Sequence, residues 1–94
     1  MAEEVISVLG PIAPGEMGIT QTHEHLLLDA YDHYGGYEFV IDDEQMMIEE
    51  LGEFTSRGGK TICEVTLDEI GRNPEGLARI ARAAKVNVIM GCGW

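Results

Sequence analysis

Positive charge is scarce in this chain, and long apolar runs are missing. The 94 residues hold only six Lys and Arg against seventeen Asp and Glu, which gives a formal net charge of −11. Nucleic acids and anionic membranes need a cationic surface that neutralises phosphate, so we expect neither as a partner. No apolar stretch approaches the roughly 18 residues of a membrane span, and the start Met1–Glu4 lacks the basic segment of a signal peptide. These absences indicate a cytoplasmic protein.

Cysteine is also sparse, and the two thiols are far apart in sequence. Cys63 and Cys92 form no CxxC motif, so we expect two buried, reduced thiols rather than a disulfide. Phosphate-binding glycine motifs are absent too, because neither GxGxxG nor GxxxxGK[ST] occurs. With 45% hydrophobic residues, the composition is that of one small folded domain rather than a disordered segment.

Apolar patterning predicts strands that alternate with helices after an N-terminal hairpin. The hairpin is expected within residues 4–18, where Gly10-Pro11 and Pro14-Gly15 mark turns. Three further strands are predicted over residues 19–26, 60–66 and 86–90. Strands joined by helices in this order lie parallel, with right-handed crossovers.

Capping residues predict where the two intervening helices begin. The first should start after Asp42 or Asp43 and be closed by Gly58-Gly59, and the second should start at Asn73-Pro74. Between the strands, residues 29–43 are irregular and long for a connector, as in functional or mobile loops. The apolar stripe of the first helix comprises Met47, Leu51 and Phe54, widened by Met46 and Ile48.

These elements predict an α/β fold that is too small to be self-contained. Parallel sheets are covered on both faces in complete proteins, yet only two helices are available here for at least three strands. Both sheet edges would also be open, and an exposed edge invites pairing with another chain. We therefore expect the chain to be an incomplete copy of a larger fold.

The most informative motif is the pair His23 and His25 near the end of the first parallel strand. Side chains alternate faces along an extended backbone, so the two imidazoles should point the same way. Zinc and similar ions favour neutral imidazole nitrogen, and α/β folds assemble active sites at the carboxyl ends of their strands. The pair predicts a divalent metal site, with satisfaction of core hydrogen bonds as the alternative interpretation.

Two histidines are fewer ligands than the three protein groups of a catalytic zinc. Asp29 and His33, in the irregular loop, are the nearby donors and are weaker candidates. Glu64 is an acid inside an apolar strand, so it must find a partner, reach a metal site or point to solvent. Glu24 should face away from the histidines and orient backbone or a basic residue.

Two strings, His23-Glu24-His25-Leu26 and Gly71-Arg72-Asn73-Pro74, closely resemble the phosphotriesterase family within the amidohydrolase superfamily. The resemblance implies a (β/α)8 barrel with two divalent metals, usually zinc, in which His23 and His25 bind the more buried ion. A bridging carboxylated lysine, or a glutamate in some relatives, two further histidines and an aspartate would lie on later strands. Glu64 does not match that bridging carboxylate. The segments that carry the resemblance are residues 8–12, 18–26, 58–62, 70–74 and 86–91.

The resemblance implies hydrolysis of a small-molecule phosphotriester, lactone or carboxyl ester by a metal-activated hydroxide. A complete barrel needs about 250 residues. We therefore expect the hairpin within 4–18 and the βαβαβ units within 19–94 of an incomplete barrel, without catalytic activity of its own. The rival hypothesis is a truncated, non-catalytic chain that binds metal weakly or assembles through its open sheet edge. Oligomeric state stays open, with a homodimer of the complete protein one alternative.

Overall fold

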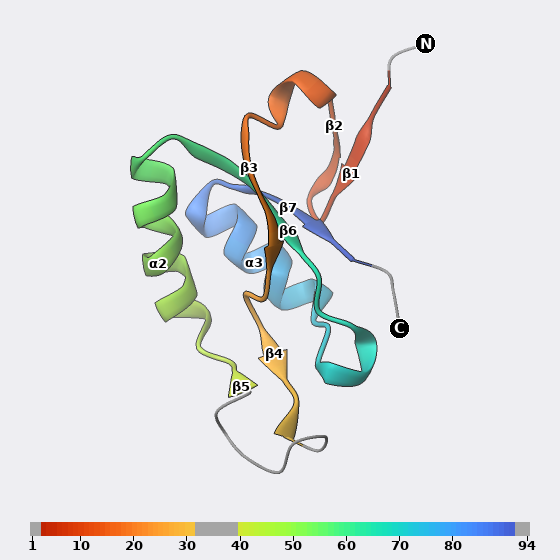
Figure 1. Ribbon diagram of the computed structural model, residues 1–94, viewed down its shortest axis with the longest axis vertical. Helices are drawn as coiled ribbons and strands as arrows, with labels where there is room; N and C mark the ends of the chain where they lie inside the picture. Colours follow the sequence, from red (N-terminus) through yellow and green to blue (C-terminus); the bar gives the residue numbers. More distant parts are fainter. Residues whose placement is uncertain (1–2, 32–39, 92–94) are drawn as a thin grey trace.

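A three-stranded parallel sheet forms the centre of the fold (Figure 1). The computed structural model describes residues 3–31 and 40–91. The strand order is β3-β6-β7, and β6 pairs in parallel with each neighbour. This confirms the predicted α/β fold with a parallel sheet. The strands are β3 (Ile19–Glu24), β6 (Gly59–Glu64) and β7 (Asn87–Met90).

Two helices make the crossovers between these strands and begin where the capping residues predict. Helix α2 (Glu44–Ser56) starts after Asp43, whose Oδ1 accepts a hydrogen bond from the Met46 N–H at 3.0 Å. Helix α3 (Pro74–Ala84) starts after Asn73, whose Oδ1 accepts from the Gly76 N–H at 3.0 Å. Of the two acids predicted as the first cap, Asp43 is therefore the one used.

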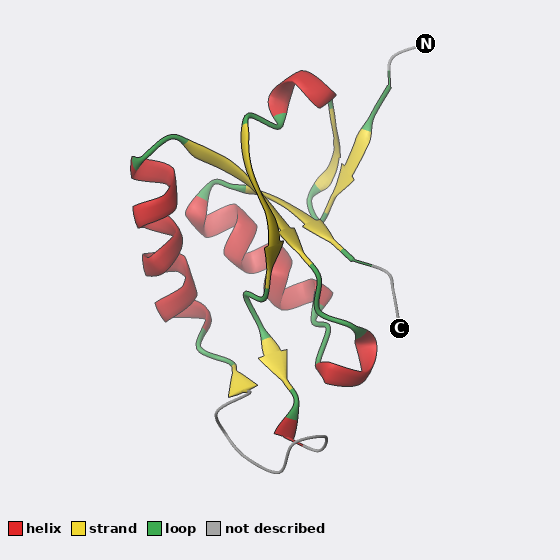
Figure 2. Ribbon diagram, viewed as in Figure 1, coloured by secondary structure: helices red, strands yellow, loops and turns green. Residues whose placement is uncertain are grey.

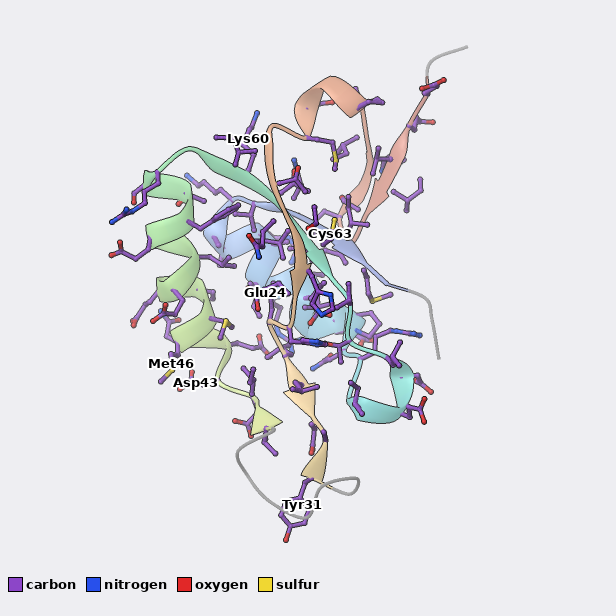
Figure 3. The ribbon with its side chains drawn as sticks, viewed as in Figure 1. Glu24, Tyr31, Asp43, Met46, Lys60 and Cys63 are labelled. Atoms are coloured by element: carbon purple, nitrogen blue, oxygen red, sulfur yellow. The ribbon has the colours of Figure 1, made fainter. Side chains whose placement is uncertain are left out.

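The core lies where the two helices pack against each other and against the sheet (Figure 2). Met47 and Phe54 of the predicted stripe pack at its border. Met46 does not belong to the stripe: it is 55% exposed and projects outward from α2 (Figure 3). The buried cluster consists of Leu26, Leu27, Leu51, Ile62, Leu77, Ile80, Ala81, Val86 and Val88.

The predicted N-terminal hairpin is present as β1 (Val5–Ser7) and β2 (Gly10–Ile12), joined by a two-residue turn. A single 3-10 turn, η1 (Pro14–Glu16), follows it. The Val8 N–H in the turn donates to the Val88 carbonyl at 2.8 Å, so the hairpin is attached to β7.

Two predictions, one about a connecting segment and one about the burial of a thiol, were wrong in part. The segment 29–43 is not irregular throughout, because β4 (Leu28–Asp29) and β5 (Val40–Ile41) pair antiparallel across its base. A two-residue ladder leaves no periodic signal in the sequence. Cys63 is a free thiol, but it is half-buried rather than buried. His33 and Cys92 lie outside the described residues.

Across residues 3–31 and 40–91, neither helix has the length and apolar content that crossing a bilayer requires.

A bidentate ion pair connects the first turn of α2 to α3. Arg79 Nε donates to Glu44 Oε1 at 2.8 Å, and Arg79 Nη2 donates to Glu44 Oε2 at 2.7 Å. The hydrogen bonds from Arg79, aided by its charge, hold the pKa of Glu44 below its ordinary value of 4.5. The ionised form of Glu44 is therefore favoured in the folded state.

We predict that, at pH values above 4.5, Glu44→Gln lowers the melting temperature by about 1–4 °C. The change is small because exposed ion pairs contribute little to stability. A lowered folded pKa stabilises the protein above the unfolded pKa, and the contribution is lost as the pH falls through the folded value. The difference between parent and variant should therefore shrink below pH 4.5 in thermal melts followed by circular dichroism. Glu49→Gln, an exposed glutamate of the same helix, is the control. A difference that stays constant with pH would contradict this assignment.

Candidate metal centre

The two histidines of the HxH motif lie side by side at the carboxyl end of β3. Their ring centroids are 5.4 Å apart, and the ring planes meet at 72°. His23 belongs to β3 and is exposed, whereas His25 is half-buried and follows the last strand residue. The predicted strand over 19–26 is therefore too long by two residues. The pairing of β3 with β6 is irregular between Gln21 and Glu24, so regular extension ends before His25.

Glu24, between the two histidines, turns away from the paired rings. Its side chain faces α2 (Figure 3), where it lines a hollow of about 530 Å³ with Met47 and Glu50. Its Oε1 also accepts a hydrogen bond from the His25 N–H at 3.0 Å. The expectation that Glu24 orients neighbouring backbone agrees with this contact. The hollow is bordered by neither histidine, so it is separate from the candidate metal centre.

Glu64 is the last residue of β6, opposite Glu24 of β3, and is 1% exposed. Its Oε2 accepts hydrogen bonds from the Leu26 N–H at 3.0 Å and the Leu27 N–H at 3.3 Å. Its Oε1 accepts from the Thr66 N–H at 2.7 Å. Glu64 therefore meets backbone donors, which satisfy a buried carboxylate without a basic side chain.

Thr66 links this carboxylate to His25 and was missed by the sequence reasoning. Its hydroxyl oxygen lies 2.8 Å from His25 Nδ1, 3.0 Å from Glu64 Oε2 and 3.0 Å from the Leu27 carbonyl oxygen. The predicted strand over 60–66 ends at Glu64, so Thr66 lies in the connection beyond β6. A hydroxyl two residues after an acid at a strand end is the signal that could have identified it.

The weaker candidate ligands do not join the histidine pair in the described part of the chain. Asp29 is exposed in β4, and its Oδ1 accepts a hydrogen bond from the Tyr31 N–H at 3.1 Å. His33 falls outside the described residues. Within 3–31 and 40–91, no three His, Cys, Asp or Glu side chains converge to hold a metal ion. The arrangement offers two imidazole donors, which fit part of a zinc coordination shell.

Comparison with known proteins places the chain in a family. The sequence model of the Phosphotriesterase family matches residues 3–94, so the chain belongs to that family. It is 31% identical to the phosphotriesterase homology protein of Mycobacterium tuberculosis, over 96% of this chain and 29% of that protein. It is 30% identical to the phospho-furanose lactonase of Mycoplasmopsis agalactiae, over 96% of this chain and 26% of that protein.

Solved structures show the same fold. An amidohydrolase from Mycoplasma synoviae matches with a TM-score of 0.89 at 31% identity, covering 98% of this chain and 27% of that one. A lactonase from Listeria monocytogenes matches with a TM-score of 0.88 at 25% identity, covering 97% of this chain and 28% of that one. The chain spans less than a third of the length of either curated relative named above.

We predict that Glu64→Gln lowers the free energy of unfolding by about 2–4 kcal/mol. In glutamine, an NH2 group replaces one of the two carboxylate oxygens and cannot accept a hydrogen bond. At least one of the buried N–H groups of Leu26, Leu27 and Thr66 therefore loses its acceptor. Urea denaturation followed by circular dichroism measures the change. Glu53→Gln, on the exposed side of α2, should change it by less than about 0.5 kcal/mol. Equal urea midpoints for parent and Glu64→Gln would rule out this role of the carboxylate.

Proposed function

We propose that this chain provides the first strands and two metal ligands of a metal-dependent hydrolase that acts on ester-type bonds. The observation that carries the proposal is the paired His23 and His25 rings at the carboxyl end of a parallel strand, in a member of the phosphotriesterase family. The names of two relatives, a phospho-furanose lactonase and a lactonase, support lactones or related esters as the substrate class. Phosphotriesters and carboxyl esters belong to the same proposal.

His23 and His25 would hold a divalent metal, which we propose to be zinc. When bound, such an ion polarises the ester oxygen and lowers the pKa of a bound water. The Nδ1 atom of His25 is hydrogen-bonded to the Thr66 hydroxyl, whereas the exposed His23 ring contacts the His25 ring edge-on. A third protein ligand must come from residues other than those described. The ligand pair therefore orients an ion but does not complete its coordination.

We propose that residues 4–18 and 19–94 correspond to the hairpin and the first βαβαβ units of a (β/α)8 barrel. The support is the close superposition on relatives of which this chain covers about a quarter. Assembly through the open side of β3 is the second candidate, because β3 pairs with β6 alone among the described strands.

Zinc titration tests the ligand assignment. We predict binding weaker than micromolar, since two imidazoles are too few for a tight site. Replacement of His23 or His25 by Ala should abolish binding, measured from the histidine ring resonances by NMR. Asp29→Asn is the matched control and should bind like the parent, because the Asp29 side chain is occupied by the Tyr31 N–H. His33→Ala decides whether the third histidine contributes. Unchanged binding in both His23→Ala and His25→Ala would refute the site.

Hydrolysis by the 94-residue chain itself is a separate test. We predict no zinc-dependent turnover of a p-nitrophenyl ester or a lactone above metal-free buffer, because the coordination shell is incomplete. Release of p-nitrophenolate, or of acid from the lactone, measures the rate. Turnover that requires metal and disappears in His23→Ala would show that the chain is active by itself.

A further inference from the structure

The Thr66 hydroxyl has three neighbours and only one proton to donate. Two of these neighbours, the Leu27 carbonyl and Glu64 Oε2, are oxygen atoms at 3.0 Å, and the third is His25 Nδ1 at 2.8 Å. A hydroxyl group has one donor and two acceptor positions, and a neutral imidazole carries its proton on one nitrogen only. The contacts therefore couple the direction of the Thr66 hydroxyl to the position of the His25 proton.

The Thr66 hydroxyl can donate to His25 Nδ1 or accept from it, and the two arrangements differ in how many buried oxygens face it without a proton between them. If the hydroxyl donated to His25 Nδ1, the Leu27 carbonyl and Glu64 Oε2 would both face the Thr66 oxygen without a proton between them. Glu64 Oε2 keeps the Leu26 and Leu27 N–H groups in either case, but in this arrangement both oxygens would turn their lone pairs toward those of the fully buried Thr66 oxygen, and such repulsion is costly where water cannot screen it. If His25 Nδ1–H donates instead, Thr66 accepts and gives its own proton to one of the oxygens. That arrangement satisfies the hydroxyl and leaves the lone pair of His25 on Nε2.

Glu64 cannot easily rotate to relieve the alternative arrangement. Both of its oxygens already accept backbone N–H groups, from Leu26 and Leu27 on one side and from Thr66 on the other. The carboxylate is therefore fixed as an acceptor toward the hydroxyl. The same bonds hold the two residues after His25, so the position of the ring is restricted together with its proton.

We propose that Glu64 and Thr66 are positioning residues that hold His25 in the Nδ1–H form and so reserve Nε2 for the metal. A histidine binds metal through the nitrogen that carries no proton, and a hydrogen bond to the other nitrogen selects which one that is. The step to metal binding rests on the proposed function. The proton position does not, because it follows from contacts within the metal-free chain.

NMR of the metal-free, 15N-labelled chain tests the proton position directly. At a pH well above the ordinary histidine pKa of about 6.5, the ring nitrogen shifts distinguish the Nδ1–H and Nε2–H forms. His25 should be in the Nδ1–H form in the parent and in Thr66→Ser, which keeps the hydroxyl. Thr66→Val should shift His25 toward a mixture of forms. A parent His25 in the Nε2–H form would overturn the proposal without any variant.

Thr61→Val is the matched control. Thr61 is also fully buried on β6, but its hydroxyl donates to the Met17 carbonyl at the opposite end of the strand. The same exchange of hydroxyl for methyl should therefore leave the His25 form unchanged. If Thr61→Val altered the proton position of His25 as much as Thr66→Val does, the effect would reflect a general loss of stability. The positioning role of Glu64 and Thr66 would then be refuted.

Zinc titration of the same variants then tests the consequence for metal binding. Thr66→Val should weaken binding by about 10-fold or more, the usual loss when a group behind a metal ligand is removed. Thr66→Ser and Thr61→Val should bind like the parent. A zinc affinity of Thr66→Val equal to that of the parent would contradict the positioning role of Glu64 and Thr66. If the parent has His25 in the Nδ1–H form but binds no zinc, the proposed function is refuted, whereas the effect of Glu64 and Thr66 on the His25 proton is still supported.

Discussion

The buried carboxylate of Glu64 is the interaction on which this end of the structure depends. Removing an ionised group from water is expensive, and here the cost is offset by three backbone N–H groups, with the Thr66 hydroxyl oxygen a further 3.0 Å neighbour. The donors come from two segments nearly forty residues apart, one after β3 and one after β6. An apolar side chain of similar size would leave those N–H groups without acceptors. The connection between the two strand ends therefore requires an acid at this position.

Packing and hydrogen bonding are coupled at the same residues. Leu26 and Leu27 donate their N–H groups to Glu64, while their side chains enter the core beside Leu77 and Ile80. A shift of the carboxylate would move both leucines, and poor packing of the leucines would displace the donors. His25 immediately precedes this pair. Its position is thus set by the core as well as by its own hydrogen bond to Thr66.

Much of the fold is predictable from the sequence, because it depends on local chemistry. Asp43 and Asn73 cap helices by bonding N–H groups three residues ahead, and such signals need no knowledge of the rest of the chain. The partners of Glu64 could not be predicted in this way. Its burial cost required some partner, but the N–H groups of Leu26 and Leu27 are available because the pairing of β3 with β6 ends at Glu24, which the sequence pattern does not mark. The end of β3 was misjudged for the same reason.

The two histidines of the candidate centre differ in how firmly the protein holds them. His25 is restricted by Thr66 and by the anchored chain that follows, whereas His23 is exposed and its ring contacts the His25 ring edge-on. A ligand that is already oriented loses little conformational freedom when it binds an ion, and a mobile one loses more. If the proposed site binds an ion, His25 would therefore set its position and His23 would adjust to it. The fixed position of the His25 ring derives from Glu64. An acid that touches no metal would therefore determine where the metal lies.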